Sequence, residues 1–261
     1  MTGAAFFDLD KTVIAKSSTL AFTGKLQKAG MLGRRVLLRA AIGQVVYVLF
    51  GADEDQLQKA RDALLTLTKG WDQDEVEQIV SETLEEVVAP LVYAEALFLI
   101  DEHLREGRRV FIVSASPDEI VRPVARYIGV TDVIATRPKV DDQGRYTGEI
   151  EYYAFGPAKA EEVRRVAEAE GIDLAGSYAY SDSATDVPLL EAVGHPHAVN
   201  PDKDLRDVAK ERGWPILDFS RQVALRSPLT RPVPLISAGA VATAIGAAVT
   251  WYLLRRGRTG T

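Results

Sequence analysis

Two aspartates separated by one residue stand at the end of a short apolar run near the start of the chain. Residues 4–9 are expected to form a buried strand, with Asp8 and Asp10 at its exit. Alternate residues of a strand project to the same side, so the two carboxylates can point into one crevice. Two like charges this close repel each other unless a cation or a shared proton relieves them. The spacing therefore favours a cation site or an acid–base pair over an ordinary strand-to-turn exit, where aspartate is also common.

More polar groups follow later apolar runs. The run 109–113 ends in a serine, a lysine lies just inside a predicted helix, and the run 177–181 ends in an acidic cluster; these residues are Ser114, Lys159, Asp182 and Asp186. In an open α/β sheet, ligands bind outside the carboxyl ends of the strands. We therefore expect these groups to meet Asp8 and Asp10 in one site.

The residue types in this set suit phosphoryl transfer. Asp8 is a possible nucleophile, and a carboxylate attacks phosphorus only when the phosphoryl charge is neutralised. Mg²⁺ does this, bound by one or two carboxylates, substrate phosphate and water, and Asp8 and Asp182 could supply those carboxylates. Lys159 offers a point charge and Ser114 a hydrogen bond to phosphate oxygens. Asp10 could protonate the leaving alcohol and then activate water.

In order and spacing, these residues resemble the four motifs of haloacid dehalogenase-type phosphatases. The motifs are Asp-x-Asp-x-Thr at 8–12, a strand ending in Ser114, the downstream Lys159, and Ser-Asp-Ser-x-x-Asp at 181–186. Each motif alone is weak, but all four in order are specific, and the resemblance covers about residues 4–218. A helical insertion between the first two motifs is similar to that of the phosphoserine phosphatase subclass.

The resemblance implies a role for each site residue. It makes Asp8 the nucleophile and a Mg²⁺ ligand, and Asp10 the acid–base residue and a ligand through its backbone carbonyl. Asp182 becomes a further Mg²⁺ ligand, and Asp186 supports the metal shell and Lys159. Thr12 helps to hold the phosphate. The substrate implied is a small phosphorylated molecule.

This sequence departs from the phosphoserine phosphatase pattern in two places. The glutamate that recognises the serine ammonium in that subclass is replaced by Ser17, and Gly-Asp-Gly-x-x-Asp is replaced by the motif at 181–186. Two substrate hypotheses therefore stay open. One is phosphoserine, and the other is a lysophospholipid or another lipid-linked phosphate, which the apolar stretch 36–50 and the apolar tail suggest. Two different functions would use the same fold: phosphoryl transfer to a second substrate, and a membrane-tethered module without activity.

Three further features of the sequence carry less weight. Asp10-Lys11-Thr12 also resembles the Asp-Lys-Thr of cation-pumping ATPases, which would make Asp10 the nucleophile, but the following Gly-Thr is absent. Ser116 is at most a contributor of backbone hydrogen bonds. The histidines show no metal-ligand spacing and receive no chemical role; they are His103, His195 and His197.

Apolar runs alternating with helical patterns predict an α/β fold with a parallel sheet covered on both faces. The expected strands are residues 4–9, 109–113, 133–135, 177–182, 197–199 and 215–217, with a hairpin over 139–153. The expected helices are residues 18–29, 31–50, 53–69, 72–88, 93–105, 118–128, 158–170 and 183–192. A Rossmann-like core of 1–15 and 96–220 would thus carry an all-helical cap of 16–95.

Composition limits the classes of function. The chain has 261 residues, 47% of them apolar, and a formal net charge of −6, which argues against nucleic acid as a partner. It has no cysteine, so neither a disulfide framework nor a thiolate metal site can form. The start of the chain shows no signal peptide.

The tail is a candidate membrane anchor. Leu235–Leu254 contains no charged residue, and as a helix it would be about 30 Å long, the thickness of a hydrocarbon core. A proline-containing linker, 221–234, precedes it. The expected location is a membrane anchor with the catalytic domain on the cytoplasmic side, and a cytoplasmic protein is the alternative. Arg255, Arg256 and Arg258 after the span run against the positive-inside tendency, so a helix lying in the membrane interface also stays open.

Overall fold

Strand β1 (Ala4–Asp8) lies in the middle of the sheet because both of its faces are apolar. The computed structural model describes residues 2–31 and 65–222. Ala5 and Phe7 point into one buried cluster, and Ala4 and Phe6 into a second cluster on the opposite face. All five residues of β1 are buried. A strand that is apolar on both sides is typical of the interior of a parallel sheet covered by helices.

The described residues form one sheet of seven strands, in the order β4-β3-β2-β1-β5-β6-β7. The remaining strands are β2 (Arg109–Pro117), β3 (Asp132–Val140), β4 (Tyr146–Tyr152), β5 (Tyr178–Ser181), β6 (His195–Val199) and β7 (Ile216–Leu217). Every neighbouring pair is parallel except β3 with β4, which is antiparallel. The chain builds outward from β1 through β2 and then crosses back to β5, so the topological switch point lies at β1.

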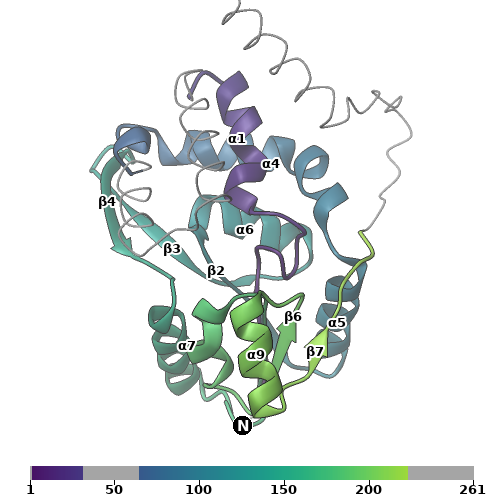
Figure 1. Cartoon of the computed structure of the whole chain (residues 1–261). Coiled ribbons are helices and arrows are strands. Elements are labelled where there is room, and N and C mark those ends of the chain that lie inside the picture. Colours follow the sequence, from purple (N-terminus) through teal and green to yellow (C-terminus); the bar gives the residue numbers. More distant parts are fainter. Residues whose placement is uncertain (1, 32–64, 223–261) are drawn as a thin grey trace, which may run out of the picture. The chain divides into compact units, whose positions relative to one another are not determined.

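Helices cover both faces of this sheet, as Figure 1 shows. The described helices are α1 (Ser18–Lys28), α4 (Gln73–Val87), α5 (Ala94–Arg105), α6 (Asp118–Tyr127), α7 (Pro157–Glu170), α8 (Val187–Leu190) and α9 (Lys203–Arg212), with 3-10 turns η1 (Ala89–Leu91) and η2 (Ala184–Asp186). Residues of α4, α5 and α6 share one buried cluster with β1 and β2, and residues of α7, α8 and α9 share the other.

Long-range hydrogen bonds fix the chain on either side of α1 and α4. Ile14 forms a bridge with Val92, Tyr93 donates its N–H to the carbonyl of Val13 at 2.9 Å, and Ala15 donates to Leu91 at 2.8 Å. The two stretches of chain that enter and leave the segment between β1 and β2 therefore lie side by side. Asp72 accepts from the N–H of Glu75 and so caps α4.

The predicted α/β class with a mostly parallel sheet is confirmed, and three details differ. The run 133–135 and the first hairpin strand are one continuous strand, β3, whose pairing with β4 shifts around Pro138 because proline has no N–H to donate. The predicted helix 183–192 is divided into η2 and the single turn α8, which carries Pro188 in its first turn. Helix α9 was not predicted; Asp202 caps it by accepting from Leu205 at 2.8 Å.

Several predicted segments lie outside the described residues. These are nearly all of the helix 31–50, most of the helix 53–69, the linker 221–234 beyond residue 222, and the apolar segment 235–254. Among the helices of residues 2–31 and 65–222, none has both the length and the apolar character needed to cross a bilayer.

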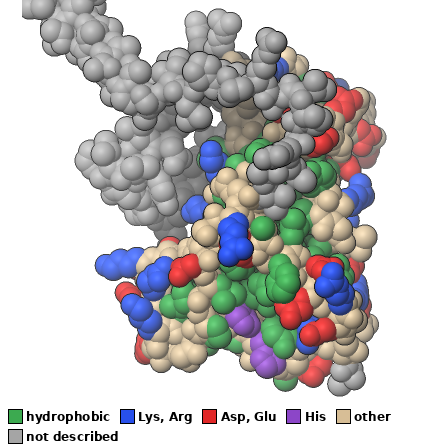
Figure 2. Space-filling view, turned by 90° about the vertical axis from the view of Figure 1, so that its right-hand side faces the viewer, with side chains coloured by type: hydrophobic (Ala, Val, Ile, Leu, Met, Phe, Trp, Pro, Cys, Tyr) green, Lys and Arg blue, Asp and Glu red, His purple; other side chains and the backbone are tan. Residues whose placement is uncertain are grey.

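The histidines take part in aromatic packing against the tyrosines of β5. His195 stacks on Tyr178 with ring centres 4.5 Å apart, and His197 stacks on Tyr180 at 4.8 Å. Tyr178 and His195 are the first paired residues of β5 and β6, at the amino ends of these strands. Figure 2 shows histidine side chains beside hydrophobic ones at the surface.

His103 is buried beside the same tyrosines in its neutral form. Its Nε2 lies 2.9 Å from the hydroxyl of Tyr180, and its Nδ1 lies 3.0 Å from a guanidinium nitrogen of Arg108. Because Arg108 can only donate, Nδ1 must accept, and the proton belongs on Nε2. Burial, helped by the charge of Arg108, lowers the pKa of His103 to about 4.

This cluster predicts a loss of stability in acid. The folded-state pKa of His103 lies below the ordinary value of 6.5. The contribution of neutral His103 to the free energy of unfolding is therefore complete above pH 7 and is lost as the pH falls toward 4. The free energy of unfolding, measured with urea across this range, should fall by about 2–3 kcal/mol more for the wild type than for His103→Phe, which cannot take up a proton. Parallel curves for the two proteins would contradict the prediction.

Candidate active site

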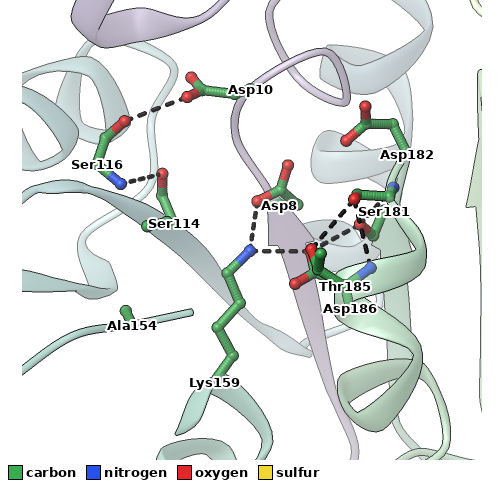
Figure 3. Close-up of polar contacts among 12 residues, drawn as sticks. Asp8, Asp10, Ser114, Ser116, Ala154, Lys159, Ser181, Asp182, Thr185 and Asp186 are labelled. Atoms are coloured by element: carbon green, nitrogen blue, oxygen red, sulfur yellow. Dashed lines mark hydrogen bonds and ion pairs between the residues drawn. The ribbon is translucent and has the colours of Figure 1, made fainter. Parts of the chain in front are cut away.

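The polar residues singled out in the sequence converge at the carboxyl end of β1. Asp8 is the last residue of β1, Ser114 lies on the neighbouring β2, and Asp182 follows β5 on the other side. Figure 3 shows Lys159 reaching up between these strand ends toward Asp8. The site therefore occupies the topological switch point, where ligands bind in sheets of this kind.

Lys159 joins two buried carboxylates. Its Nζ lies 2.7 Å from Oδ1 of Asp8 and 2.8 Å from Oδ2 of Asp186, and only 3% of Lys159 is exposed. The hydroxyl of Ser181 donates to the same Asp186 oxygen at 2.7 Å. Lys159 is thus not an ordinary solvated helix lysine, because its ammonium group is held inside the site by two partners.

The local fold explains how Lys159 reaches the site. Helix α7 begins at Pro157, a favoured residue for the first helical position, and is preceded by Gly156 at φ +55°, which few other residues adopt. Lys159 then lies in the first turn, with the helix start directed at the strand ends.

Burial and crowding by like charges set the electrostatics of the carboxylates. Burial raises the pKa of Asp8 well above its usual value; Lys159 opposes this rise, and the charges of Asp186, Asp182 and Asp10 add to it. Burial likewise raises the pKa of Asp182 to about 6, with Lys11 opposing and Asp186 adding. Negative charge is therefore in excess at this point, and a cation would relieve it.

Lysine 159 responds in the opposite sense. Burial by itself lowers the pKa of an ammonium group, but the charges of Asp8 and Asp186 and their hydrogen bonds outweigh burial and raise the pKa of Lys159. The lysine therefore stays charged and holds Asp8 in one orientation.

The loop after β1 carries two more expected site residues, Asp10 and Thr12, with Lys11 between them. Asp10 accepts from the N–H of Ser18 at 2.7 Å and from the hydroxyl of Ser116 at 3.1 Å. Lys11 has φ +60°, and its ammonium lies 3.8 Å from Asp182. Thr12 is fully buried, and its hydroxyl has no hydrogen-bond partner among residues 2–31 and 65–222. Strained backbone and an unpaired buried hydroxyl are features of functional sites.

Asp8 and Asp10 therefore have different partners. Asp8 contacts the buried lysine, whereas Asp10 contacts an amide and a serine hydroxyl at the start of α1 and the end of β2. A nucleophile requires charge stabilisation, which Asp8 has. This geometry favours Asp8 over Asp10 as the nucleophile. It argues against the alignment with the Asp-Lys-Thr of cation-pumping ATPases, in which Asp10 would be the nucleophile.

Four residues support the site through contacts that the sequence did not predict. Ser116 reaches Asp10 through its side chain, and Ser181 holds Asp186. Thr136 donates to the carbonyl of Ala115 at 2.7 Å, beside Ser114. Asp202 donates its N–H to the carbonyl of Asp182 at 2.8 Å, and its side chain accepts from Ala184. The spacing of two between Ser114 and Ser116 on one strand was a signal for Ser116.

The donor set fits Mg²⁺. Among the described residues, no group of three or more acidic or histidine side chains is placed to hold a metal by itself. Mg²⁺ does not require one, because it commonly takes one or two carboxylates and completes its shell with water and phosphate. Asp8 and Asp182 offer buried carboxylates, and Oδ1 of the buried Asp186 has no partner among the described residues.

Comparison with known proteins gives the family. Residues 5–191 match the model of the haloacid dehalogenase-like hydrolases. The chain is 51% identical, over 97% of its length, to the "inhibition of morphological differentiation" protein of Streptomyces azureus and to a probable phosphatase of Mycobacterium tuberculosis, of which it covers 94% and 89%.

More distant relatives have names that specify substrates. A phosphoserine phosphatase of M. tuberculosis is 34% identical over 84% of this chain and 71% of the relative. A histidinol-phosphatase of Neisseria meningitidis is 31% identical over 84% of this chain and the whole of the relative. A crystal structure of a Bordetella pertussis protein of unknown function is 33% identical, with a TM-score of 0.73 over 84% of this chain and 99% of that one.

Three findings lead to one assignment: the family match over most of the chain, the relatives named as phosphatases, and the motif residues gathered at the end of β1. The chain belongs to the haloacid dehalogenase-like hydrolases and is a phosphatase of that family.

Proposed function

We propose that the chain is a Mg²⁺-dependent phosphatase that hydrolyses phosphomonoesters through a phosphorylated Asp8. The observation that carries this proposal is the buried contact of Asp8 with Lys159 at the switch point of the sheet. Asp182 and Asp10 lie close enough to act on the charge of Asp8. This arrangement combines a nucleophile, a positive charge and an acid–base candidate in one place.

In the first half of the reaction, a carboxylate oxygen of Asp8 bonds to phosphorus while the bond from phosphorus to the substrate's alcohol oxygen breaks. Asp10 gives its proton to that oxygen, so the alcohol leaves neutral and Asp10 becomes a carboxylate. In the second half, Asp10 takes a proton from a water molecule as the water oxygen bonds to phosphorus. The bond between Asp8 and phosphorus then breaks, and inorganic phosphate leaves.

The other residues of the set hold the phosphoryl group and the metal. Lys159 balances negative charge on Asp8 and on the phosphoryl oxygens, and Ser114 and Thr12 donate hydrogen bonds to those oxygens. Asp8, the backbone carbonyl of Asp10 and Asp182 would hold Mg²⁺, supported by Asp186. When bound, Mg²⁺ supplies positive charge that stabilises the transition state. The division into a core of 1–15 and 96–220 and a cap of 16–95 belongs to the same proposal.

Two competing functions would use the same fold. A module without activity has no need of a buried lysine between two carboxylates, and such a cluster is costly to bury. The intact set of Asp8, Asp10, Ser114, Lys159 and Asp182 therefore favours catalysis. Transfer of the phosphoryl group to an alcohol instead of water needs the same residues, and product analysis distinguishes it from hydrolysis.

The substrate is a small phosphorylated molecule, and Ser17 bears on which one. Ser17 precedes α1, and its side chain makes no capping hydrogen bond. It occupies the place of the glutamate expected to bind the ammonium of phosphoserine, so we propose that phosphoserine is not the best substrate. A lipid-linked phosphate is the second candidate; its support is the apolar segments 36–50 and 235–254, which lie outside the described residues.

The location belongs to the proposal as well. We propose that residues 235–254 anchor the enzyme in a membrane, with the catalytic domain on the cytoplasmic side. The support is the uncharged length of this segment and the arginines before it, Arg221, Arg226 and Arg231.

The first prediction tests the two aspartates. Asp8→Asn should reduce turnover of a phosphomonoester to background, because an amide neither attacks phosphorus nor balances a cation. Asp10→Asn should lower turnover by about 10²–10⁴-fold through lost proton transfer. Phosphate release should be measured with Mg²⁺ and after chelation, which should abolish it.

Asp101→Asn is the matched control, because Asp101 is an exposed aspartate of α5 paired with Arg105. It should keep the wild-type rate, and circular dichroism should show that all three variants are folded. Wild-type turnover in Asp8→Asn would refute the mechanism, and a rate within about twofold of wild type in Asp10→Asn would remove it from acid–base catalysis.

The second prediction concerns the substrate. Ser17→Glu should raise kcat/KM for phosphoserine about tenfold, as expected for one new charge-assisted hydrogen bond to the ammonium group. Ser17→Gln, of equal size but neutral, should not. A panel of phosphoserine, histidinol phosphate and lysophosphatidate, assayed with the wild type, ranks the candidates; preference for the polar esters over lysophosphatidate would exclude the lipid-linked substrate.

The third prediction concerns the tail. Removal of residues 232–261 should yield an active phosphatase that stays in the supernatant after ultracentrifugation, while the full-length chain sediments with membranes. Equal partition of both proteins into the supernatant would show that the segment 235–254 is not an anchor.

A further inference from the structure

The carboxylate of Asp10 is held by groups from two distant parts of the chain. Its Oδ1 accepts from the backbone N–H of Ser18 at 2.7 Å, and its Oδ2 accepts from the hydroxyl of Ser116 at 3.1 Å. Ser18 starts helix α1, and Ser116 lies near the end of β2. Figure 3 shows the contact between Asp10 and Ser116. Ser116 is 6% exposed and Ser18 is fully buried.

Ser116 in turn belongs to a group of three hydroxyls. The hydroxyl of Ser18 donates to Ser116 at 2.9 Å, and the hydroxyl of Thr19 lies 3.1 Å from it with either oxygen able to donate. A serine hydroxyl has one proton to donate and two lone pairs to accept. With Asp10 ionised, Ser116 donates to Asp10 and accepts from Ser18 and Thr19, so its capacity is filled.

The two contacts of Asp10 differ in whether they allow the contacted oxygen to carry a proton. The amide of Ser18 can only donate, so Oδ1 must accept whether Asp10 is ionised or neutral. A proton on Asp10 therefore belongs on Oδ2, which faces Ser116. The hydroxyl of Ser116 can rotate to accept from a neutral Asp10 and can then donate to Thr19 instead.

We propose that Ser116 is the positioning residue for Asp10, with Thr19 as its exchange partner, and that it orients the carboxyl group both before and after proton transfer to the leaving group. This inference rests on the proposed function, in which Asp10 is the acid–base residue. Without Ser116, Oδ2 loses its only hydrogen bond among the described residues, and the carboxyl group can turn away from the substrate. Ser116 acts through Asp10 and has no contact with substrate in this assignment.

The test compares two phosphate esters that differ in their need for a proton. The phenolate of p-nitrophenyl phosphate leaves without protonation, whereas an alkyl phosphate such as glycerol 2-phosphate needs an acid. Ser116→Ala should lower kcat/KM for the alkyl ester about tenfold and for the aryl ester by less than about threefold. The tenfold loss is a fraction of the whole effect of general acid catalysis, because Asp10 itself is still present. The quantity kcat/KM reports the step that forms the aspartyl-phosphate, in which the leaving group departs.

Three further variants make the test specific. Ser116→Thr keeps the hydroxyl and should restore most of the alkyl-ester activity. Thr19→Val should shift the ratio in the same direction as Ser116→Ala but less, and it provides the measurement if Ser116→Ala does not fold. Ser177→Ala is the control, because its buried hydroxyl accepts from Ala4 at 2.9 Å and donates to Asp173, at the other end of β1; it should leave the ratio of the two esters unchanged.

The wild-type rate and its loss in Asp8→Asn test the proposed function, whereas the ratio between the two esters tests the role of Ser116. An increased aryl-to-alkyl ratio in Ser116→Ala and Thr19→Val, restored in Ser116→Thr, supports the proposal. A ratio equal to that of the wild type in Ser116→Ala, or in Thr19→Val where that variant replaces it, overturns the proposal.

Discussion

The buried ammonium group of Lys159 between Asp8 and Asp186 is the interaction on which the site depends. Removing a lysine and two carboxylates from water is costly, and their mutual attraction repays that cost only when the geometry is good. Distances of 2.7 and 2.8 Å from Nζ to the two carboxylates meet that condition. The cluster joins the end of β1, the start of α7 and the turn η2, so it fixes three separate segments relative to one another.

The same cluster constrains the catalytic chemistry. Three buried carboxylates and one buried lysine leave an excess of negative charge, which a divalent cation would balance. Asp8 is oriented by Lys159, whereas Asp10 is oriented by Ser18 and Ser116. Two aspartates of the same type, separated by one residue, are therefore placed for different tasks by different neighbours.

Much of this arrangement could be predicted from the sequence, because apolar runs and the residues that end them carry a strong signal. The α/β class, the parallel sheet around β1 and the meeting of Asp8, Ser114, Lys159 and Asp182 all follow from such runs. Helix α9 escaped notice because it is short and strongly polar, and just two of its residues, Leu205 and Ala209, are buried.

The hydrogen-bonded network could not be predicted in the same way. Ser116 and Ser18 are separated by 98 positions in the sequence, and nothing local shows that they meet. The long strand β3 was predicted as two pieces, residues 133–135 and the start of the hairpin 139–153. Pro138 lies between these pieces, where the pairing with β4 shifts. Tertiary packing decided both outcomes.

The two edges of the sheet have a consequence for association between copies of the protein. An exposed edge strand offers unpaired backbone groups to a neighbour, and proteins avoid this with short strands, charges or a covering segment. Strand β7 has only two residues, and β4 bears Glu149 and Glu151, which pair with Lys139 and Arg137 of β3. The first residue of β4, Tyr146, is paired through its backbone with Gly70 and Trp71. Sheet-to-sheet addition between copies of the protein is thus disfavoured at both edges.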